Sequence, residues 1–516
     1  MRFEWLLAAI PLLVLGVAVY DLLQKKHAIL RNFPVIGHFR YILEAIGPEL
    51  RQYIVTDNDE ERPFSRDQRR WVYASSKREN NYFGFGTDND LERTPNYPVL
   101  KHATFPYEAR HPEAENWPLP CAKTLGAWRG RKHAFRPASI LNVSAMSFGS
   151  LSAAAIEALN QGCKLGDALH NTGEGGVSDY HKRGGDLIWQ IGTGYFGCRA
   201  SDGGFDLERF KETVASAPVK AIEVKLSQGA KPGHGGVLPA AKITKEISRI
   251  RGIPMGQDCL SPAGHRAFSN VDEMLDFIET LADVSGLPVG IKSAVGEMGF
   301  WEELAAKMAA TQRGPDFITI DGAEGGTGAA PLAYADHVAL PFKVAMCRVY
   351  PIFVQAELAE KIVFIGSGRL GFPVQAMLAM SLGCDMVNVA REAMLAIGCI
   401  QAQRCHTGHC PTGVATQNKW LMRGLDPTLK AARLANYLTV MRKEMTELSR
   451  SCGEPHPALI TTDHFEILDD RFASDTAREV FRYEVGWGRP SKDDREVIRW
   501  IMAGSPAGSD PATPNG

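Results

Sequence analysis

The sequence has little net charge and few cysteines for its length. Its 57 Lys and Arg residues are balanced by 59 Asp and Glu residues, which leaves no basic surplus to indicate nucleic-acid binding. Ten cysteines in 516 residues do not indicate a disulfide scaffold, and a reducing compartment suits them. Seven are isolated and are expected as small buried apolar residues: Cys121, Cys163, Cys198, Cys259, Cys347, Cys384 and Cys452.

Long hydrophobic runs are absent except at the N-terminus. Residues 5–20, WLLAAIPLLVLGVAVY, carry no charge, and a basic cluster follows at residues 25–31. Positive charge on that side predicts a cytoplasmic location for the rest of the chain. We therefore predict a single-pass transmembrane anchor over residues 1–25 in the cell membrane. A cleaved signal peptide is the alternative, but its basic cluster would precede the apolar run.

Three of the ten cysteines lie close together. Cys399, Cys405 and Cys410 fall within the run GCIQAQRCHTGHCPTGVATQ. Soft thiolates at short spacing are what an iron–sulfur cluster needs, and such a cluster moves single electrons. Zinc is a competing interpretation because His406 and His409 interleave the thiols, but the paired C-x-x-C elements of structural zinc are absent. Three cysteines favour a three-iron cluster, or a four-iron cluster with an outside ligand.

From about residue 139, short apolar runs alternate with amphipathic stretches. The pattern predicts strands at 140–146, 168–173, 221–226, 257–262, 288–294, 317–322, 362–368 and 386–390. It predicts helices at 152–164, 238–250, 271–284, 300–311, 373–382 and 425–455. This alternation matches an α/β fold of the (β/α)8 TIM-barrel type, which keeps its chemistry at the C-terminal ends of the strands.

The predicted domain organisation follows from these patterns. The anchor at 1–25 leads into an N-terminal collar at 26–115, which carries no recognisable chemical motif. The barrel and an iron–sulfur loop after its last strand occupy 116–455. A C-terminal extension follows at 456–516, and its tail after residue 502 is expected to be disordered.

Two glycine-rich loops follow late strands. DGAEGGTGA (321–329) frees backbone N–H groups to converge on a phosphate. GSGRLG (366–371) matches the dinucleotide fingerprint, but the next strand leads to Arg391 where that fold expects an acid. GTGYFG (192–197) opens no convincing helix. We interpret both matches as barrel loops, and the two late loops as the site of a flavin mononucleotide phosphate.

Charged side chains near strand ends are candidates for the chemistry. Lys225 and Lys292 fall within or at the end of apolar strands, where burial of a lysine needs a reason. Lys231 lies in the loop KLSQGAKPGHGG, and a cation there suits the N1–C2 edge of a reduced flavin. Glu174 in NTGEGG is a candidate to orient an amine or relay a proton, and capping of backbone N–H groups is its alternative role.

Together these motifs resemble a known family. MSFGSLS, NTGEGG, QGAKPGHGG, DGAEGGTGA and the cysteine run occur in the order found in the synthase domain of glutamate synthases. The apolar N-terminus and the length are most similar to stand-alone, membrane-anchored members from bacteria. The resemblance implies an FMN-binding barrel, a 3Fe–4S cluster on Cys399, Cys405 and Cys410, and reductive conversion of 2-oxoglutarate and ammonia to L-glutamate.

The resemblance also implies roles for individual residues. Lys225 and Arg251 would hold the 2-oxoglutarate carboxylates, and Lys231 and Glu174 would be catalytic. Lys231 would lie at the N1 region of the flavin. The other FMN contacts would be Ser147, Gln228, Lys292, Gly325, Gly326, Thr327, Gly368 and Arg391.

Two positions depart from the family pattern. Val237 stands where the family has a glutamine, and Tyr195 where the large enzymes have an arginine. They favour, as an alternative, the same fold and cofactors acting on another amine or 2-oxo acid, such as an N-alkylglutamate. Ammonia is expected from outside, and electrons from a ferredoxin-like or flavoprotein donor. A non-enzymatic, membrane-tethered electron-transfer module is a third possibility.

Overall fold

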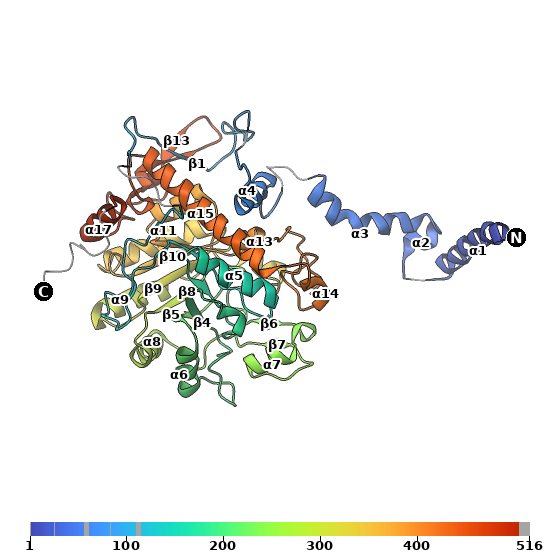
Figure 1. The fold of residues 1–516 in the computed structure, drawn as a ribbon, viewed down its shortest axis with the longest axis horizontal. Coiled ribbons are helices and arrows are strands. Elements are labelled where there is room, and N and C mark those ends of the chain that lie inside the picture. Colours follow the sequence, from blue (N-terminus) through green and yellow to red (C-terminus); the bar gives the residue numbers. More distant parts are fainter. Residues whose placement is uncertain (1, 25, 56–60, 83, 110–114, 505–516) are drawn as a thin grey trace. The chain divides into compact units, whose positions relative to one another are not determined.

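The computed structural model describes residues 2–24, 26–55, 61–82, 84–109 and 115–504 (Figure 1). The chain divides into two compact units, residues 1–67 and residues 68–516. The tail predicted to be disordered lies almost wholly outside the described residues.

The first unit is helical, with α1 (Arg2–Leu23), α2 (Ala28–Asn32) and α3 (Gly37–Tyr53). Asp21 is fully buried where α1 ends, and it accepts hydrogen bonds from the Val35 N–H at 2.8 Å and from Nε2 of His38 at 3.0 Å. These bonds fix the turn between α1 and α3.

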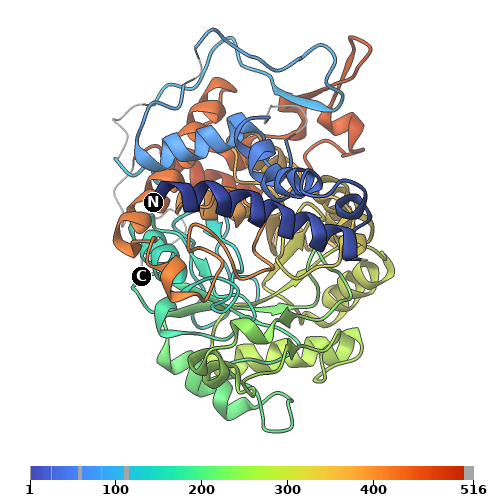
Figure 2. The ribbon, with the colours of Figure 1, turned by 90° about the vertical axis from the view of Figure 1, so that its right-hand side faces the viewer.

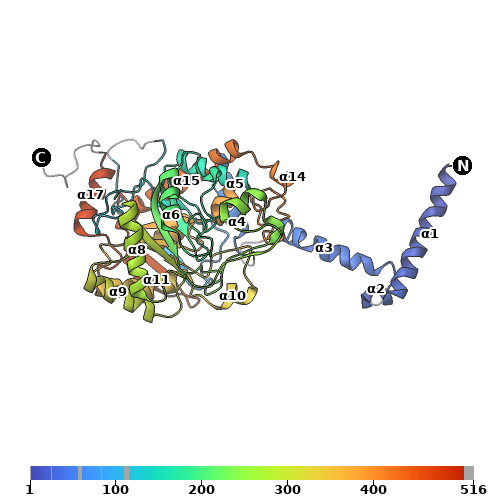
Figure 3. The ribbon, with the colours of Figure 1, turned by 90° about the horizontal axis from the view of Figure 1, so that it is seen from below.

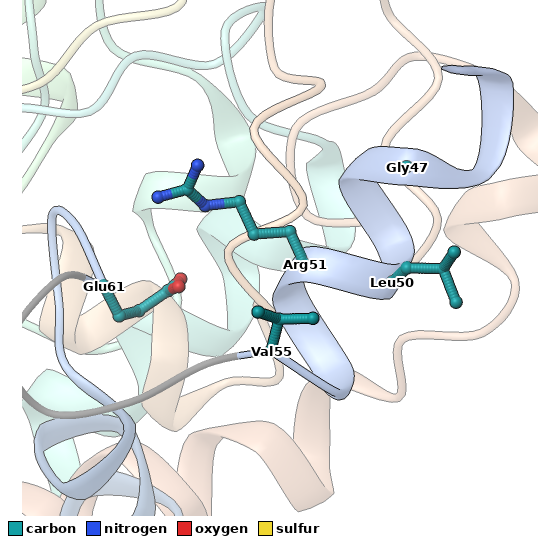
Figure 4. A pocket seen from close by; sticks show the side chains of 5 residues that line it. All are labelled: Gly47, Leu50, Arg51, Val55 and Glu61. Carbon is teal, nitrogen blue, oxygen red and sulfur yellow. The ribbon is translucent and has the colours of Figure 1, made fainter. Parts of the chain in front are cut away.

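Figure 4 shows a pocket in the first unit, lined by Gly47, Leu50, Arg51, Val55 and Glu61. No helix among the described residues combines the length and apolarity that a membrane crossing requires. The predicted transmembrane anchor over residues 1–25 is therefore not supported by the structure.

The second unit contains a closed parallel barrel, as predicted. Its strands follow the order β10-β11-β2-β3-β4-β5-β8-β9 around the barrel. Their bounds are β2 (Leu141–Val143), β3 (His170–Asn171), β4 (Leu187–Ile191), β5 (Val219–Lys225), β8 (Val289–Ser293), β9 (Phe317–Asp321), β10 (Val363–Ser367) and β11 (Met386–Val389). Nearly every strand residue is buried, which explains why these strands are continuous apolar runs.

One predicted barrel strand is wrong and one barrel strand was missed. The segment predicted at 257–262 forms only β7 (Cys259–Leu260), which pairs antiparallel with β6 (Val237–Leu238) outside the barrel. The missing barrel strand is β4, whose sequence LIWQI leads directly into the GTGYFG loop. A five-residue strand buried on both faces shows no alternation of polar and apolar residues, so its sequence gives only a weak strand signal. The glycines that follow it indicate a loop.

Helices cover the outside of the barrel (Figures 1 and 3). Those that follow strands include α5 (Ala153–Leu165), α6 (Leu207–Ser216), α7 (Lys245–Arg251), α8 (Val271–Ser285), α9 (Gly299–Thr311), α10 (Leu332–His337), α11 (Phe342–Gln355), α12 (Pro373–Ser381) and α13 (Arg391–Ala396). The helix predicted at 238–250 is shorter than expected, because Thr244 caps α7 by accepting the Ile247 N–H.

The remaining elements lie outside the barrel, and all but the first residues of α4 belong to the second unit. Figure 2 shows the chain passing from green through yellow to orange around this unit. The elements are α4 (Arg66–Lys77), α14 (Lys419–Met422), α15 (Pro427–Ser451), α16 (Ala477–Val480), α17 (Lys492–Met502) and the antiparallel sheet β1 (Tyr97–Leu100), β12 (Phe465–Leu468) and β13 (Ser474–Thr476).

Buried ion pairs close the N-terminal end of the barrel. Lys123 Nζ lies 3.0 Å from Asp385, which precedes β11 and also accepts the Phe364 N–H. Arg131 lies 3.0 Å from Asp316, which precedes β9 and accepts the Val289 N–H. Because barrel chemistry lies at the opposite end, we assign these pairs to stability.

Candidate active site

Lys225 and Glu174 form an ion pair at the C-terminal end of the barrel. Lys225 is the last residue of β5, and Glu174 follows β3. The Lys225 ammonium donates to Glu174 Oε1 at 2.8 Å and to Gln228 Oε1 at 3.2 Å. The side chains of Lys225 and Glu174 are 10% and 21% exposed, so water screens the pair only weakly.

Two more cations act on the same carboxylate. Lys231 is buried in the loop after β5, and burial together with the charge of Lys225 lowers its pKa. Arg251 ends α7 and donates to Ser147 Oγ at 3.3 Å and to the Phe148 carbonyl at 3.2 Å. The structure thus brings together five of the predicted residues: Ser147, Glu174, Lys225, Lys231 and Arg251.

The charge of Glu174 is stabilised by these neighbours. Burial alone would raise its pKa, but the charge and hydrogen bond of Lys225, with the charges of Lys231 and Arg251, outweigh it and hold the pKa at about 2. Glu174 is therefore an ionised carboxylate at neutral pH, and the group as a whole carries a surplus of positive charge.

Glycines leave the space in which these side chains meet. A Cβ at Gly192 would lie 2.5 Å from Glu174 Oε2, and one at Gly175 would lie 2.9 Å from Nη2 of Arg251. A side chain at these positions of NTGEGG and GTGYFG would therefore clash with the charged cluster, which explains the glycines. GTGYFG follows β4 and opens no helix, as predicted.

A polar layer lies inside the barrel at the level of Glu223, two residues before Lys225. Glu223 is fully buried and accepts hydrogen bonds from Asn171 at 2.8 Å, Gln190 at 2.6 Å and Thr319 at 2.7 Å. Because residues two apart on a strand share a face, Glu223 and Lys225 both face the barrel interior. This layer supports the end of β5.

The two late glycine loops meet a group of cations, as a phosphate site requires. Arg391 donates to the Glu324 carbonyl, and a Cβ at Gly326 would lie 2.9 Å from the Arg391 side chain. Gly368 has φ +132°, which L side chains rarely adopt. Burial lowers the pKa of Lys343, and the charge of Glu324 opposes this shift. The residues present therefore fit the phosphate of a flavin.

Other predicted flavin contacts lie between this loop and Lys225. Gln228 Nε2 donates to the Gly326 carbonyl at 3.4 Å. Lys292, buried at the end of β8, lies 3.6 Å from Asp321, which also accepts the Gly229 N–H. The Gly325 N–H bonds the Gly322 carbonyl, and Thr327 Oγ1 accepts the Ala329 N–H.

The three predicted cluster ligands lie near one another after α13. Cys405 and Cys410 act electrostatically on the Cys399 thiol, and Cys410 acts on the Cys405 thiol. Burial alone would raise the pKa of Cys410, but hydrogen bonds from the backbone at Ala415, Thr412 and Val414 outweigh it and lower that pKa. Such donors suit a cluster thiolate.

The cysteine loop also touches the phosphate loop. A Cβ at Gly328 would lie 3.2 Å from Cys405, and Lys242 donates to the Cys405 carbonyl at 2.7 Å. Among the described residues, no group of three or more His, Cys, Asp or Glu side chains is arranged to hold a metal ion. Cys399, Cys405 and Cys410 would supply the thiolates for a cluster that carries single electrons, and this cluster stays a prediction.

Comparison with known proteins decides the family. The conserved region of glutamate synthases matches residues 130–454, which contain the ion pair, both late glycine loops and the three cysteines. The chain belongs to the glutamate synthase family. It is therefore an oxidoreductase of the class that acts on the CH–NH2 group of donors.

The chain is similar in sequence to two glutamate synthase relatives, and it aligns at low identity with one solved structure. It is 38% identical over 490 residues to the glutamate synthase large subunit-like protein YerD of Bacillus subtilis, covering 88% of this chain and 93% of that one. It is 34% identical to the archaeal glutamate synthase [NADPH] of Methanocaldococcus jannaschii, covering 60% of this chain and 58% of that one. An L230A mutant flavocytochrome b2 with benzoylformate aligns at 13% identity with a TM-score of 0.45, covering 93% of this chain and 97% of that one.

Sequence reasoning missed four residues of this glutamate synthase-type site. Lys242 contacts the cysteine loop, Lys343 interacts electrostatically with Glu324 and Arg369, and His265 contacts Lys225. Arg369 stands inside the GSGRLG motif and was open to prediction. The other three lie in segments without a motif, so only the fold reveals them.

Proposed function

We propose that this protein converts 2-oxoglutarate and ammonia to L-glutamate with electrons from a separate donor. The reaction consumes one oxo acid, one ammonia, two electrons and two protons, and it releases glutamate and water. The observation that carries the proposal is the convergence of Lys225, Lys231 and Arg251 on the single carboxylate of Glu174. This surplus of positive charge suits a substrate with two carboxylates.

The residues have distinct roles in this proposal. Lys225 and Arg251 bind the carboxylates, and the glycines around them leave the space that these side chains need. Glu174 orients the amine through its ionised carboxylate. FMN and a 3Fe–4S cluster, when bound, would supply hydride transfer and single-electron steps. Arg391 with the two late loops would hold the flavin phosphate, and Cys399, Cys405 and Cys410 would hold the cluster.

A second candidate keeps the fold and cofactors and changes the amine or the oxo acid. Val237 is part of β6, in the loop region that begins with Lys231, and offers no hydrogen bond from its side chain. The Tyr195 hydroxyl is engaged by His265 and Ala267. Both observations favour a pocket with fewer polar contacts to substrate than the family pattern provides. Family membership favours either enzyme over the non-enzymatic alternative.

The cysteine loop is our proposed contact for the electron donor. Residues 398–424 contain Arg404, Lys419 and Arg423 but no Asp or Glu. Trp420 is 68% exposed, and the guanidinium of Arg423 lies 3.7 Å from the centre of its ring. Exposed Trp and Arg residues are frequent anchors of protein interfaces. A ferredoxin-like or flavoprotein donor with an acidic surface would complement this charge.

The assay supplies the anaerobic protein with reduced ferredoxin, 2-oxoglutarate and either ammonium or methylamine. Mass spectrometry of the products then decides between the candidates. Glutamate from ammonium supports the first, and a preference for N-methylglutamate supports the second. Absence of both products from protein that contains flavin and iron would contradict the first proposal.

A location in the cell membrane with the catalytic domain in the cytoplasm stays a prediction from the N-terminal sequence. The basic cluster at 25–31 supports only its orientation. Fractionation of cells that express the full chain tests it, and recovery of all the protein in an alkaline wash of the membranes would contradict it.

A further inference from the structure

His265 holds the main chain of Lys225 from a loop outside the barrel strands. This loop follows β7, and Nε2 of the His265 ring lies 2.9 Å from the Lys225 carbonyl oxygen. A carbonyl oxygen only accepts hydrogen bonds, so Nε2 must carry the proton and donate it. The tautomer of His265 is thereby fixed at one of its two nitrogens.

Tyr195 fixes the other nitrogen. Its hydroxyl oxygen accepts the Ala267 N–H at 3.0 Å and lies 3.1 Å from Nδ1 of His265. Burial lowers the pKa of His265, which keeps the ring neutral near pH 7. A neutral ring protonated at Nε2 accepts at Nδ1, so Tyr195 donates its hydroxyl proton to His265.

The hydrogen-bonded chain from Tyr195 through His265 to the Lys225 carbonyl is called the relay below. Packing holds its two rings in one orientation. The His265 ring stacks on Phe268 with centroids 4.6 Å apart, and Tyr195 meets it edge-on at 5.4 Å. Tyr195 is fully buried, and its loop is held to the His265 loop by the Thr193 hydroxyl, which donates to the Pro262 carbonyl at 2.6 Å. The charged groups that act on His265 are Glu174 and Lys225.

We propose that His265 and Tyr195 are positioning residues that fix the carbonyl of Lys225 and thereby place its ammonium group for substrate. Lys225 is held twice, at its carbonyl by His265 and at its ammonium by Glu174. Displacement of a binding group by about 1 Å costs up to about 100-fold in rate, so this second support matters. The inference rests on the substrate-binding role proposed for Lys225.

Three variants test the relay. His265→Leu removes the donor to Lys225, whereas His265→Gln retains an N–H donor at nearly the same place. Tyr195→Phe removes the hydroxyl that fixes Nδ1. We expect His265→Leu to raise KM for the oxo acid about tenfold, equivalent to ~1.4 kcal/mol, with a smaller change in kcat. His265→Gln should restore most of the wild-type KM, and Tyr195→Phe should fall between them.

His456 offers a matched control. It is fully buried, its Nε2 lies 3.0 Å from the Pro120 carbonyl, and its Nδ1 accepts the Ala458 N–H at 3.0 Å. His456→Leu therefore loses the same kind of bond away from the site. It should lower stability as His265→Leu does but leave KM unchanged. An equal rise in KM in both variants would show a merely structural effect and overturn the proposal.

A second readout does not depend on turnover. Acetic anhydride labels Lys225 in protein that contains its cofactors but no substrate, and mass spectrometry follows the labelling. The rate reports how firmly the ammonium group is held. His265→Leu should raise this rate severalfold, and His456→Leu should not change it. If the wild type does not turn over 2-oxoglutarate, the proposed function is contradicted. The labelling rates still test whether His265 positions Lys225. An unchanged labelling rate in His265→Leu would overturn it.

Discussion

At the scale of single residues, the site depends on one carboxylate among three cations. The motifs NTGEGG and KLSQGAKPGHGG predicted Glu174, Lys225 and Lys231, because a charged side chain among glycines at a strand end has few structural roles. His265 could not be predicted, because its partner is a backbone carbonyl brought close only by the fold.

Glu174→Gln should destabilise the protein at neutral pH by ~2 kcal/mol. This is less than the ~3–5 kcal/mol for a fully buried pair, because Glu174 is 21% exposed. A carboxyl whose pKa is lowered by folding stabilises the protein above its unfolded value, and this stabilisation is lost as pH falls towards the folded value. The stabilisation by Glu174 is therefore lost as the pH falls from 4.5 to about 2.

Urea unfolding of wild type and Glu174→Gln at neutral pH and in this acid window measures the effect. The difference in free energy of unfolding between the two proteins should be largest at neutral pH and should shrink as pH falls through the window. A difference that stays constant, or grows in acid, would show that the Glu174 carboxylate is not stabilised by its cationic neighbours.

At the scale of elements, seven of the eight predicted barrel strands are confirmed, and the eighth is β4 rather than the segment at 257–262. Buried strands followed by glycine loops were predictable because apolar runs and turn residues are local signals. The antiparallel pair β6–β7 was not predictable, because two-residue strands are defined by their pairing alone.

The packing of α5 against α15 gives a prediction at this scale. A Cβ at Gly162 would lie 2.7 Å from Leu434 and 2.9 Å from the Ala431 carbonyl, so Gly162→Ala should destabilise the barrel unit by ~1–3 kcal/mol. Gly47 is also helical but has open space around its Cβ position, so Gly47→Ala should not destabilise the protein. Thermal unfolding compares the variants, and equal melting temperatures would refute the close packing.

The cysteine loop gives a second prediction for an element. Cys405→Ser should remove most of the iron and its visible absorption while flavin stays bound, because the proposed flavin contacts lie in other loops. Cys163→Ser is the control, since Cys163 is a buried thiol of α5 far along the chain from this loop. Iron analysis and absorption spectra decide, and a normal cluster spectrum in Cys405→Ser would remove this residue as a ligand.

At the scale of the whole molecule, the barrel brings together groups that are distant in the sequence. Gln228 bonds Gly326, and Gly328 packs on Cys405, so the proposed substrate residues, the two late glycine loops and the cysteine loop lie next to one another. Purified protein should therefore contain flavin and iron together. Colourless protein after anaerobic reconstitution with both would contradict this organisation.

The most direct test is a crystal structure of the loaded protein with 2-oxoglutarate. Our account predicts that the carboxylates of the ligand lie against Lys225 and Arg251, with Glu174 and Lys231 beside them at the C-terminal end of the barrel. A ligand bound elsewhere on the barrel, with the Lys225–Glu174 pair unchanged and no contact to Arg251, would contradict the account.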